Sequence, residues 1–183
     1  MSEKEREKRK RKATVIRRFR KVHRYSGVAL FVFLFIIGIT SVLLGWKKNS
    51  GDLLMPETRR GTAGSLAQWL PLDSLQLTAY AALPDGTYSL DRIDVRPEKG
   101  MAKFRFKEGN MEVQVDGITG HILHKGPRVA DLVESIHDGS YIDDLLGTGG
   151  VFKVFYSTVT GLALTMFVIS GFWLWYGPKR MRR

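Results

Sequence analysis

The side chains best suited to ligand chemistry in this 183-residue chain are its four histidines, because the chain contains no cysteine. The lack of cysteine excludes a disulfide framework, a thiolate nucleophile, and Cys-ligated zinc or iron–sulfur centres. His23 and His137 each lie beside a long apolar segment, whereas His121 and His124 flank a short predicted strand. A neutral imidazole is a common metal ligand, but one beside an apolar segment equally contacts lipid head groups. The residues alone leave both interpretations open.

Three carboxylates, Asp138, Asp143 and Asp144, precede the second apolar segment. Carboxylates suit hard cations such as iron, although a solvated loop has the same composition. The chain has no HExxH motif, Walker A loop, Rossmann glycine fingerprint or spaced Ser/His/Asp set. It therefore offers no visible site for a nicotinamide or flavin, and a redox function would need electrons from a quinol or a redox partner.

Two uncharged segments position these side chains. Residues 25–46 carry no charge and would span about 33 Å as a helix, enough for a bilayer core. Residues 154–178 are also uncharged, and aromatic residues gather at the ends of both segments, as in membrane helices. The first segment is longer than a signal-peptide core, so we expect an uncleaved anchor.

The basic residues predict the topology. Twelve Lys and Arg precede the first apolar segment and four follow the second, which predicts that both termini are cytoplasmic. In a bacterial inner membrane the region between the segments is then periplasmic. The basic N-terminal residues fit topology and attraction to anionic lipid better than binding of nucleic acid, because no folded reader motif accompanies them. We expect five parts: a tail 1–24, a span 25–46, an extracytoplasmic domain 47–150, a span 151–177 and a tail 178–183.

The central domain shows helical and alternating patterns. We expect helices over 62–70 and 73–82, split by Pro71, and a later helix over 129–136. Alternation of apolar and polar residues predicts strands over residues 87–95, 101–107 and 111–115. A last short strand, HILH, is expected from residue 121. Gly109-Asn110 suits a hairpin turn, and DGITG from Asp116 opens another.

Three motifs together resemble one family, the bacterial PepSY-associated transmembrane helix proteins. The sequence HRYSG opens the first span, IHDGSY precedes the second, and GLALTMFVISGFWLW fills the second. Between them, the DGITG segment resembles the end of a PepSY repeat, with Asp116, Thr119 and Gly120 in its Asp-x-x-Thr-Gly turn. The resemblance implies an α+β membrane protein in which two transmembrane helices flank a small PepSY-like domain of helix and antiparallel sheet.

The resemblance also implies a function. Larger members of the family have about four spans, and some resemble inner-membrane reductases that carry haem b and reduce siderophore-bound ferric iron outside the cytoplasm. Two spans make this chain half of such a protein, and a homodimer would restore four. His23 and His137 are the expected haem-iron ligands, one near each membrane face, so each would need an imidazole from a second subunit. The alternative is a non-enzymatic membrane module whose PepSY-like domain binds or regulates a periplasmic partner such as a peptidase or transporter.

Both predicted spans contain small residues that would let another group approach the helix backbone closely. Gly27 and Gly38 lie on the same face of the first span as His23. In the second span, small residues four positions apart form a row on one helix face: Ser157, Gly161 and Thr165. Small residues admit either a flat macrocycle or a neighbouring helix. We expect Gly27 and Gly38 to border the cofactor, with helix packing as the alternative.

Overall fold

The computed structural model describes residues 2–182, with side chains through residue 179. Two compact units emerge: one combines the chain up to residue 41 with residues from 136 on, and the other is residues 42–135. The first is helical and contains the second expected span and most of the first, up to residue 41. The second contains the sheet and the helix that packs on it, and the expected domain 47–150 continues from residue 136 in the first unit.

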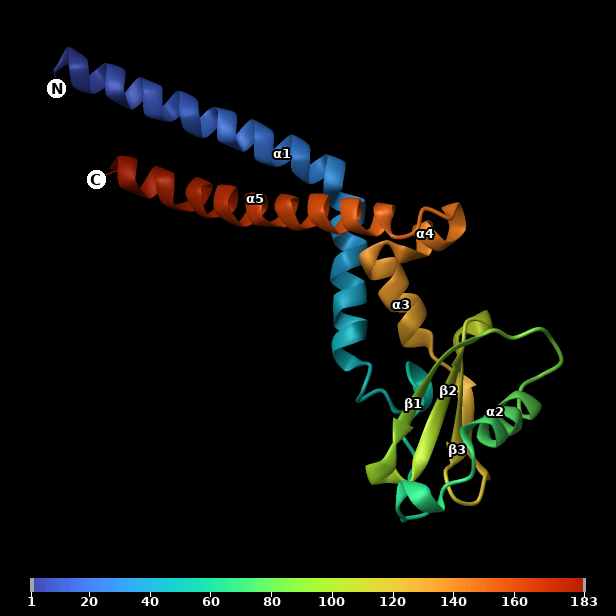
Figure 1. Ribbon diagram of the computed structural model, residues 1–183. Helices are drawn as coiled ribbons and strands as arrows, with labels where there is room; N and C mark the ends of the chain where they lie inside the picture. Colours follow the sequence, from blue (N-terminus) through green and yellow to red (C-terminus); the bar gives the residue numbers. More distant parts are fainter. Residues whose placement is uncertain (1, 183) are drawn as a thin grey trace. The chain divides into compact units, whose positions relative to one another are not determined.

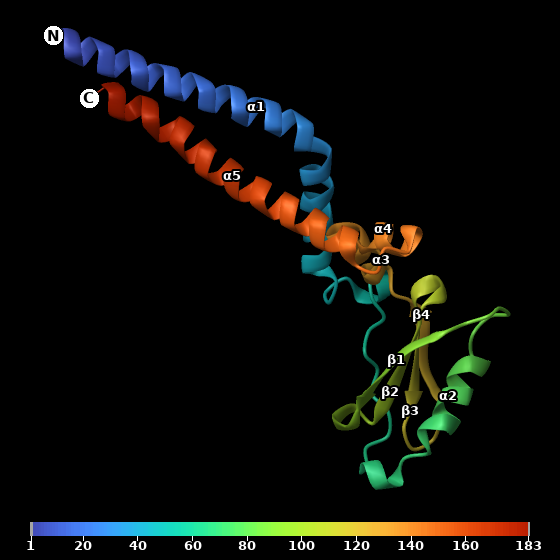
Figure 2. The same cartoon turned by 45° about the horizontal axis from the view of Figure 1, so that its top comes forward.

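The helical unit is built on α1 (Glu3–Trp46) and α5 (Val151–Arg182). The first part of α1 runs beside α5, and α1 then bends so that its second part turns away from α5 (Figures 1 and 2). Both are long and apolar enough to cross a membrane. Many of their large apolar side chains are exposed, including Val28, Phe31 and Phe172. Exposed apolar surface of this extent fits contact with lipid rather than water.

The basic N-terminal segment is helical. α1 is continuous from Glu3, so residues expected as a tail and as a span form one element. Lys, Arg and Glu are good helix formers, and Glu3 and Glu5 favour the positive N-terminal end of the helix dipole. A short helix that the sequence pattern did not predict, α4 (Ser140–Leu146), precedes α5.

The second unit, residues 42–135, is the sheet unit: it contains a four-stranded antiparallel sheet in the order β1-β2-β3-β4. Its strands and their bounds are β1 (Leu90–Arg96), β2 (Met101–Phe106), β3 (Met111–Asp116) and β4 (Ile122–Pro127). The helix α2 (Leu72–Ala81) covers one face, and Figure 1 shows it beside the strands. Two of its residues are fully buried, together with alternating residues of β2 and β3: Leu75, Ala79, Ala102, Phe104, Val113 and Val115. The predicted strands are confirmed, with β1 beginning at Leu90 rather than at residue 87.

The helix expected over 62–70 is wrong. Only Leu66–Gln68 forms one turn of 3-10 helix, and the chain before it is extended. The amide of Gly61 donates to the carbonyl of Lys99, and the amide of Thr62 donates to a carboxylate oxygen of Asp116. Hydrogen bonds to the turn before β2 and to the end of β3 thus replace helical hydrogen bonds in this segment. Two glycines, Gly61 and Gly64, also weaken helix formation here.

The Asp-x-x-Thr-Gly turn forms as expected. Asp116 Oδ1 accepts from the amides of Ile118 and Thr119 at 2.8 and 2.9 Å, and Gly120 adopts a positive φ of 71°. Asp116 Oδ2 accepts from the amide and hydroxyl of Thr62 at 2.7 and 2.8 Å. Burial works to raise the pKa of Asp116, but these hydrogen bonds prevail and lower it to about 2.

Candidate functional site

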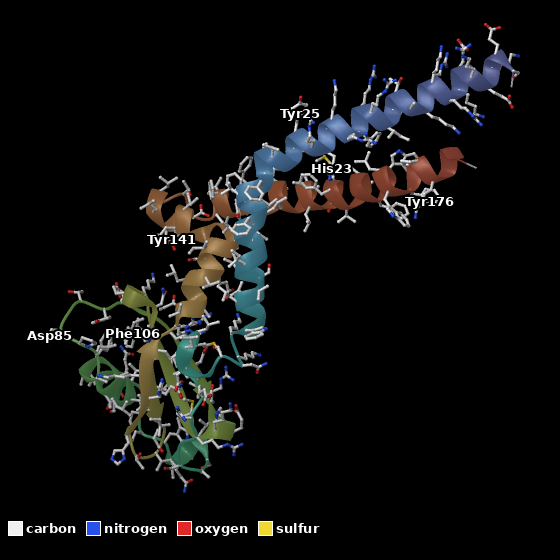
Figure 3. All side chains as sticks on the ribbon, turned by 180° about the vertical axis from the view of Figure 1, so that it is seen from behind. His23, Tyr25, Asp85, Phe106, Tyr141 and Tyr176 are labelled. Atoms are coloured by element: carbon white, nitrogen blue, oxygen red, sulfur yellow. The ribbon has the colours of Figure 1, made fainter. Side chains whose placement is uncertain are left out.

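His23 lies on the side of α1 that faces α5, where two contacts orient its ring. Its Nδ1 atom lies 2.7 Å from Oγ of Ser170, a buried residue of α5. The Phe167 ring meets the imidazole edge to face, with ring centroids 5.0 Å apart. Figure 3 shows His23 between the two helices, whereas Tyr25 projects from the far side of α1. The side chain is therefore turned into the helical unit and not toward head groups.

His137 has a matching contact. It lies at the end of α3 (Val129–Asp138), and its Nδ1 atom is 2.8 Å from Oγ1 of Thr40. Thr40 belongs to α1 and is only 7% exposed. Each histidine is thus held by a buried hydroxyl of a long apolar helix. Sequence reasoning did not single out either hydroxyl, although Ser170 stands in the quoted motif of the second span.

Each hydroxyl also lies close to a carbonyl oxygen of its own helix. Ser170 Oγ lies 2.6 Å from the carbonyl oxygen of Met166, and Thr40 Oγ1 lies 2.8 Å from that of Ile36. A hydroxyl has one hydrogen, so if it donates to the carbonyl it accepts from Nδ1–H of the histidine, and the lone pair of the neutral ring is then on Nε2. If the hydroxyl donates to Nδ1 instead, the ring has the opposite tautomer.

A shallow, open apolar depression lies one helical turn beyond His23. Its volume is about 340 Å³, and it is lined by Gly27, Phe31, Leu34, Phe35 and Phe167. A Cβ atom at Gly27 would meet the Phe167 ring at 3.6 Å, in ordinary contact distance. Gly27 borders this depression, and its predicted place beside a cofactor stays a prediction.

The structure does not bring His23 and His137 together. Positions 23 and 40 of α1, which contact the two sites, are about 25 Å apart along a helix that rises 1.5 Å per residue. One chain therefore presents two separate imidazoles. Gly38 lies between them and is exposed, with no atom of the described chain within 4 Å of a Cβ placed on it. Its predicted role beside a cofactor or second helix stays a prediction.

Of the three acidic residues before α5, Asp138 and Asp143 have structural partners, whereas Asp144 is exposed. Asp138 pairs with Lys153 Nζ at 2.6 Å. Asp143 accepts from the amides of Phe152 and Lys153 and from the Thr148 hydroxyl, which caps the first turn of α5. Burial works to raise the pKa of both aspartates, but these hydrogen bonds hold each pKa below its ordinary value. Among residues 2–182 no three His, Asp or Glu side chains are grouped to hold a metal ion.

The remaining histidines lie in the sheet unit. His121 is exposed before β4, and Nε2 of the half-buried His124 lies 3.7 Å from a carboxylate oxygen of Asp52. Neither is held by a buried hydroxyl as His23 and His137 are.

Comparison with known proteins gives one match. The profile of a protein family described as the PepSY-associated TM region matches residues 20–183. No curated protein and no solved structure matches the chain.

Proposed function

Because the chain belongs to the family of the PepSY-associated TM region, and is a membrane protein with two apolar helices, we propose that it binds haem b and passes electrons across the membrane. The expected acceptor is ferric iron, free or bound to a siderophore, on the side of the sheet unit. The observation that carries the proposal is the shared arrangement of His23 and His137, each with Nδ1 within hydrogen-bond distance of a buried hydroxyl. We propose that Nδ1 donates to this hydroxyl and leaves Nε2 as the basic nitrogen.

The residues fit the group in polarity and in donor type. Haem, when bound, supplies a centre that gains and loses a single electron. His23 and His137 would each provide one axial nitrogen, and Ser170 and Thr40 would hold the rings in place. The apolar depression beside Gly27 would contact part of the macrocycle of the first site.

The separation of the two histidines supports a homodimer. A single chain gives each site one imidazole, and a two-fold axis would bring a second His23 to the first site and a second His137 to the other. The open surface at Gly38 leaves room for a second helix. Donation by a quinol or a redox partner fits the lack of a nucleotide motif in the sequence.

A second function is favoured by a different observation. α2 exposes Leu72 and Leu77, the latter 71% exposed, on a helix whose other side packs on the sheet. Apolar side chains exposed on a small extracytoplasmic domain suit a protein partner, such as a peptidase or transporter component. In that case the helices serve as anchors.

The visible spectrum of the detergent-purified chain from haem-replete cells separates the two. We expect a Soret band, and sharp α and β bands after dithionite reduction. His23→Ala and His137→Ala should each lower the haem content per chain, and His121→Ala, a histidine without a buried hydroxyl partner, is the matched control. A colourless preparation, or loss of haem only in His121→Ala, would overturn the haem proposal and favour the partner-binding module.

The hydroxyls provide a second, independent test. Ser170→Ala and Thr40→Val remove the acceptor of each Nδ1–H while leaving the imidazole in place. In the haem-free protein, nitrogen NMR of the histidines should show a single Nδ1–H tautomer for wild type and a mixture for the variant. In the haem-loaded protein, the reduction potential of only the corresponding site should shift, because the second shell tunes ligand basicity.

A further inference from the structure

The sheet has a second face that is polar, and a cavity of about 620 Å³ opens on it. We infer that this cavity is a binding site for an oxyanion, a phosphate or carboxylate group of a small molecule or of a lipid. The inference goes beyond the proposed function and does not depend on haem. All the lining residues belong to the unit of residues 42–135.

Most of the charged side chains that line the cavity are basic. Six of the lining side chains are basic and two, Glu57 and Asp94, are acidic; the basic ones are Lys47, Lys48, Arg96, Lys99, Lys103 and Arg128. Lys and Arg side chains bind phosphate and carboxylate groups. Arg donates two parallel hydrogen bonds, and Lys acts as a point charge.

Three of the basic residues are already neutralised. Lys47 pairs with Glu134 at 3.3 Å. Lys103 and Arg128 share the fully buried carboxylate of Glu112, and Lys103 lies 3.0 Å from it. The pairs of Lys103 and Arg128 fix the inner wall of the cavity, because Glu112 also accepts from the Gln114 amide, Arg128 also pairs with Asp131, and the exposed fraction of the Lys103 side chain is only 5%. The Lys47–Glu134 pair is more exposed.

The other three basic residues are available to a ligand. Within the described chain, Lys48, Arg96 and Lys99 have no acidic side chain within ion-pair distance. Glu57 lies 3.7 Å from Arg59, so Asp94 is the one lining carboxylate left to oppose them. Three unpaired cations against one carboxylate leave a positive excess for an anion.

The local fold explains why these cations converge. Asp94 stands opposite Lys103 in the sheet, and alternation along β1 puts Arg96 on the same face. Lys99 follows in the turn between β1 and β2, where Gly100 adopts a positive φ of 65°. Lys48 comes from the chain just after α1, two residues beyond Trp46, at the end of the apolar segment. Phosphate can therefore reach the cavity from a phospholipid head group or from solution.

The test uses the full chain purified in a neutral detergent. Inorganic phosphate and citrate are titrated by calorimetry, and short-chain phosphatidylglycerol is compared with phosphatidylcholine by native mass spectrometry. The key variant is Arg96→Gln with Lys99→Gln, and the matched control is Lys107→Gln, an exposed lysine beyond the other end of β2. We expect the double variant to weaken anion binding at least about tenfold, since charged hydrogen bonds are lost, and the control to leave it unchanged.

The arms identify the source of the anion. Binding of citrate or phosphate that is lost in the double variant supports a soluble ligand. Preference for phosphatidylglycerol that is lost in the double variant supports a lipid. No anion binding in either arm, or equal binding by wild type and double variant, overturns the inference. If the double variant does not fold, judged by its near-ultraviolet circular dichroism, Lys48→Gln replaces it under the same criteria.

Discussion

Replacing Asp116 with asparagine tests how much the Asp-x-x-Thr-Gly turn contributes to the stability of the sheet unit. The carboxylate accepts four hydrogen bonds, from three amides and the Thr62 hydroxyl. An asparagine of the same shape keeps one acceptor oxygen, but its NH₂ group faces donors. The variant therefore loses two of the four bonds together with the charge.

The magnitude follows from the pKa. The pKa of Asp116 falls from 3.8 in the unfolded chain to about 2 in the folded protein. Without solvent screening, this shift would contribute about 2.5 kcal/mol to the free energy of unfolding. Solvent screening reduces this value to about 1–2 kcal/mol. A depressed native pKa stabilises above the unfolded pKa, so this contribution is complete above about pH 5 and is lost as the pH falls from about 4 to 2. The asparagine variant should lack this part of the pH dependence.

Trp69 provides a local probe. A Cβ placed on Gly117, the residue after Asp116, would overlap the indole ring of Trp69 at 2.3 Å, so this ring packs directly on the turn. Urea unfolding of the full chain in detergent is followed by Trp69 fluorescence, with the other three tryptophans replaced by phenylalanine. Asp85→Asn is the matched control, because Asp85 lies exposed on a loop (Figure 3). Equal unfolding midpoints for the two variants at pH 7 would refute the argument.

Three further perturbations test other parts of the chain. Glu112→Gln should destabilise the sheet unit by about 3–5 kcal/mol, because it leaves Lys103 and Arg128 without their buried partner; an unchanged urea midpoint would contradict this. Gly38→Leu should shift the particle to monomer in size-exclusion chromatography without loss of helicity, since nothing in the protomer opposes the side chain, and an unchanged elution volume would place the dimer contact elsewhere. Asp143→Asn should speed amide exchange at Phe152 and Lys153 only, and equal rates would rule out its capping role.

Local patterns predicted the sheet and the two long helices. Alternation identified β2 and β3, because successive side chains of a strand point to opposite faces of the sheet and the apolar set packs against α2. The apolar segments were visible because charge is absent over about twenty residues. The expected helix at 62–70 was wrong because bonds to distant residues, Lys99 and Asp116, decide the path of that segment.

The candidate site was predictable only in part. The two histidines stand out by residue type, but their hydroxyl partners are far away in the chain, on other helices. The polar sheet face was missed for a similar reason. Lys103 and Glu112 look like solvent-facing residues of amphipathic strands, and only the return of the chain at Arg128 shows that both are buried. Burial of charge depends on such long-range pairing, which alternation does not encode.

The order of the strands has a consequence for biosynthesis. Each strand pairs with its nearest neighbour in the chain, and α2 precedes them directly, so the core of the sheet unit is complete once Pro127 has been made. Such a topology has low contact order, which favours rapid folding. We expect this unit to fold while α5 is still being synthesised, so that the second apolar helix emerges beside a domain that already shields its own hydrophobic residues.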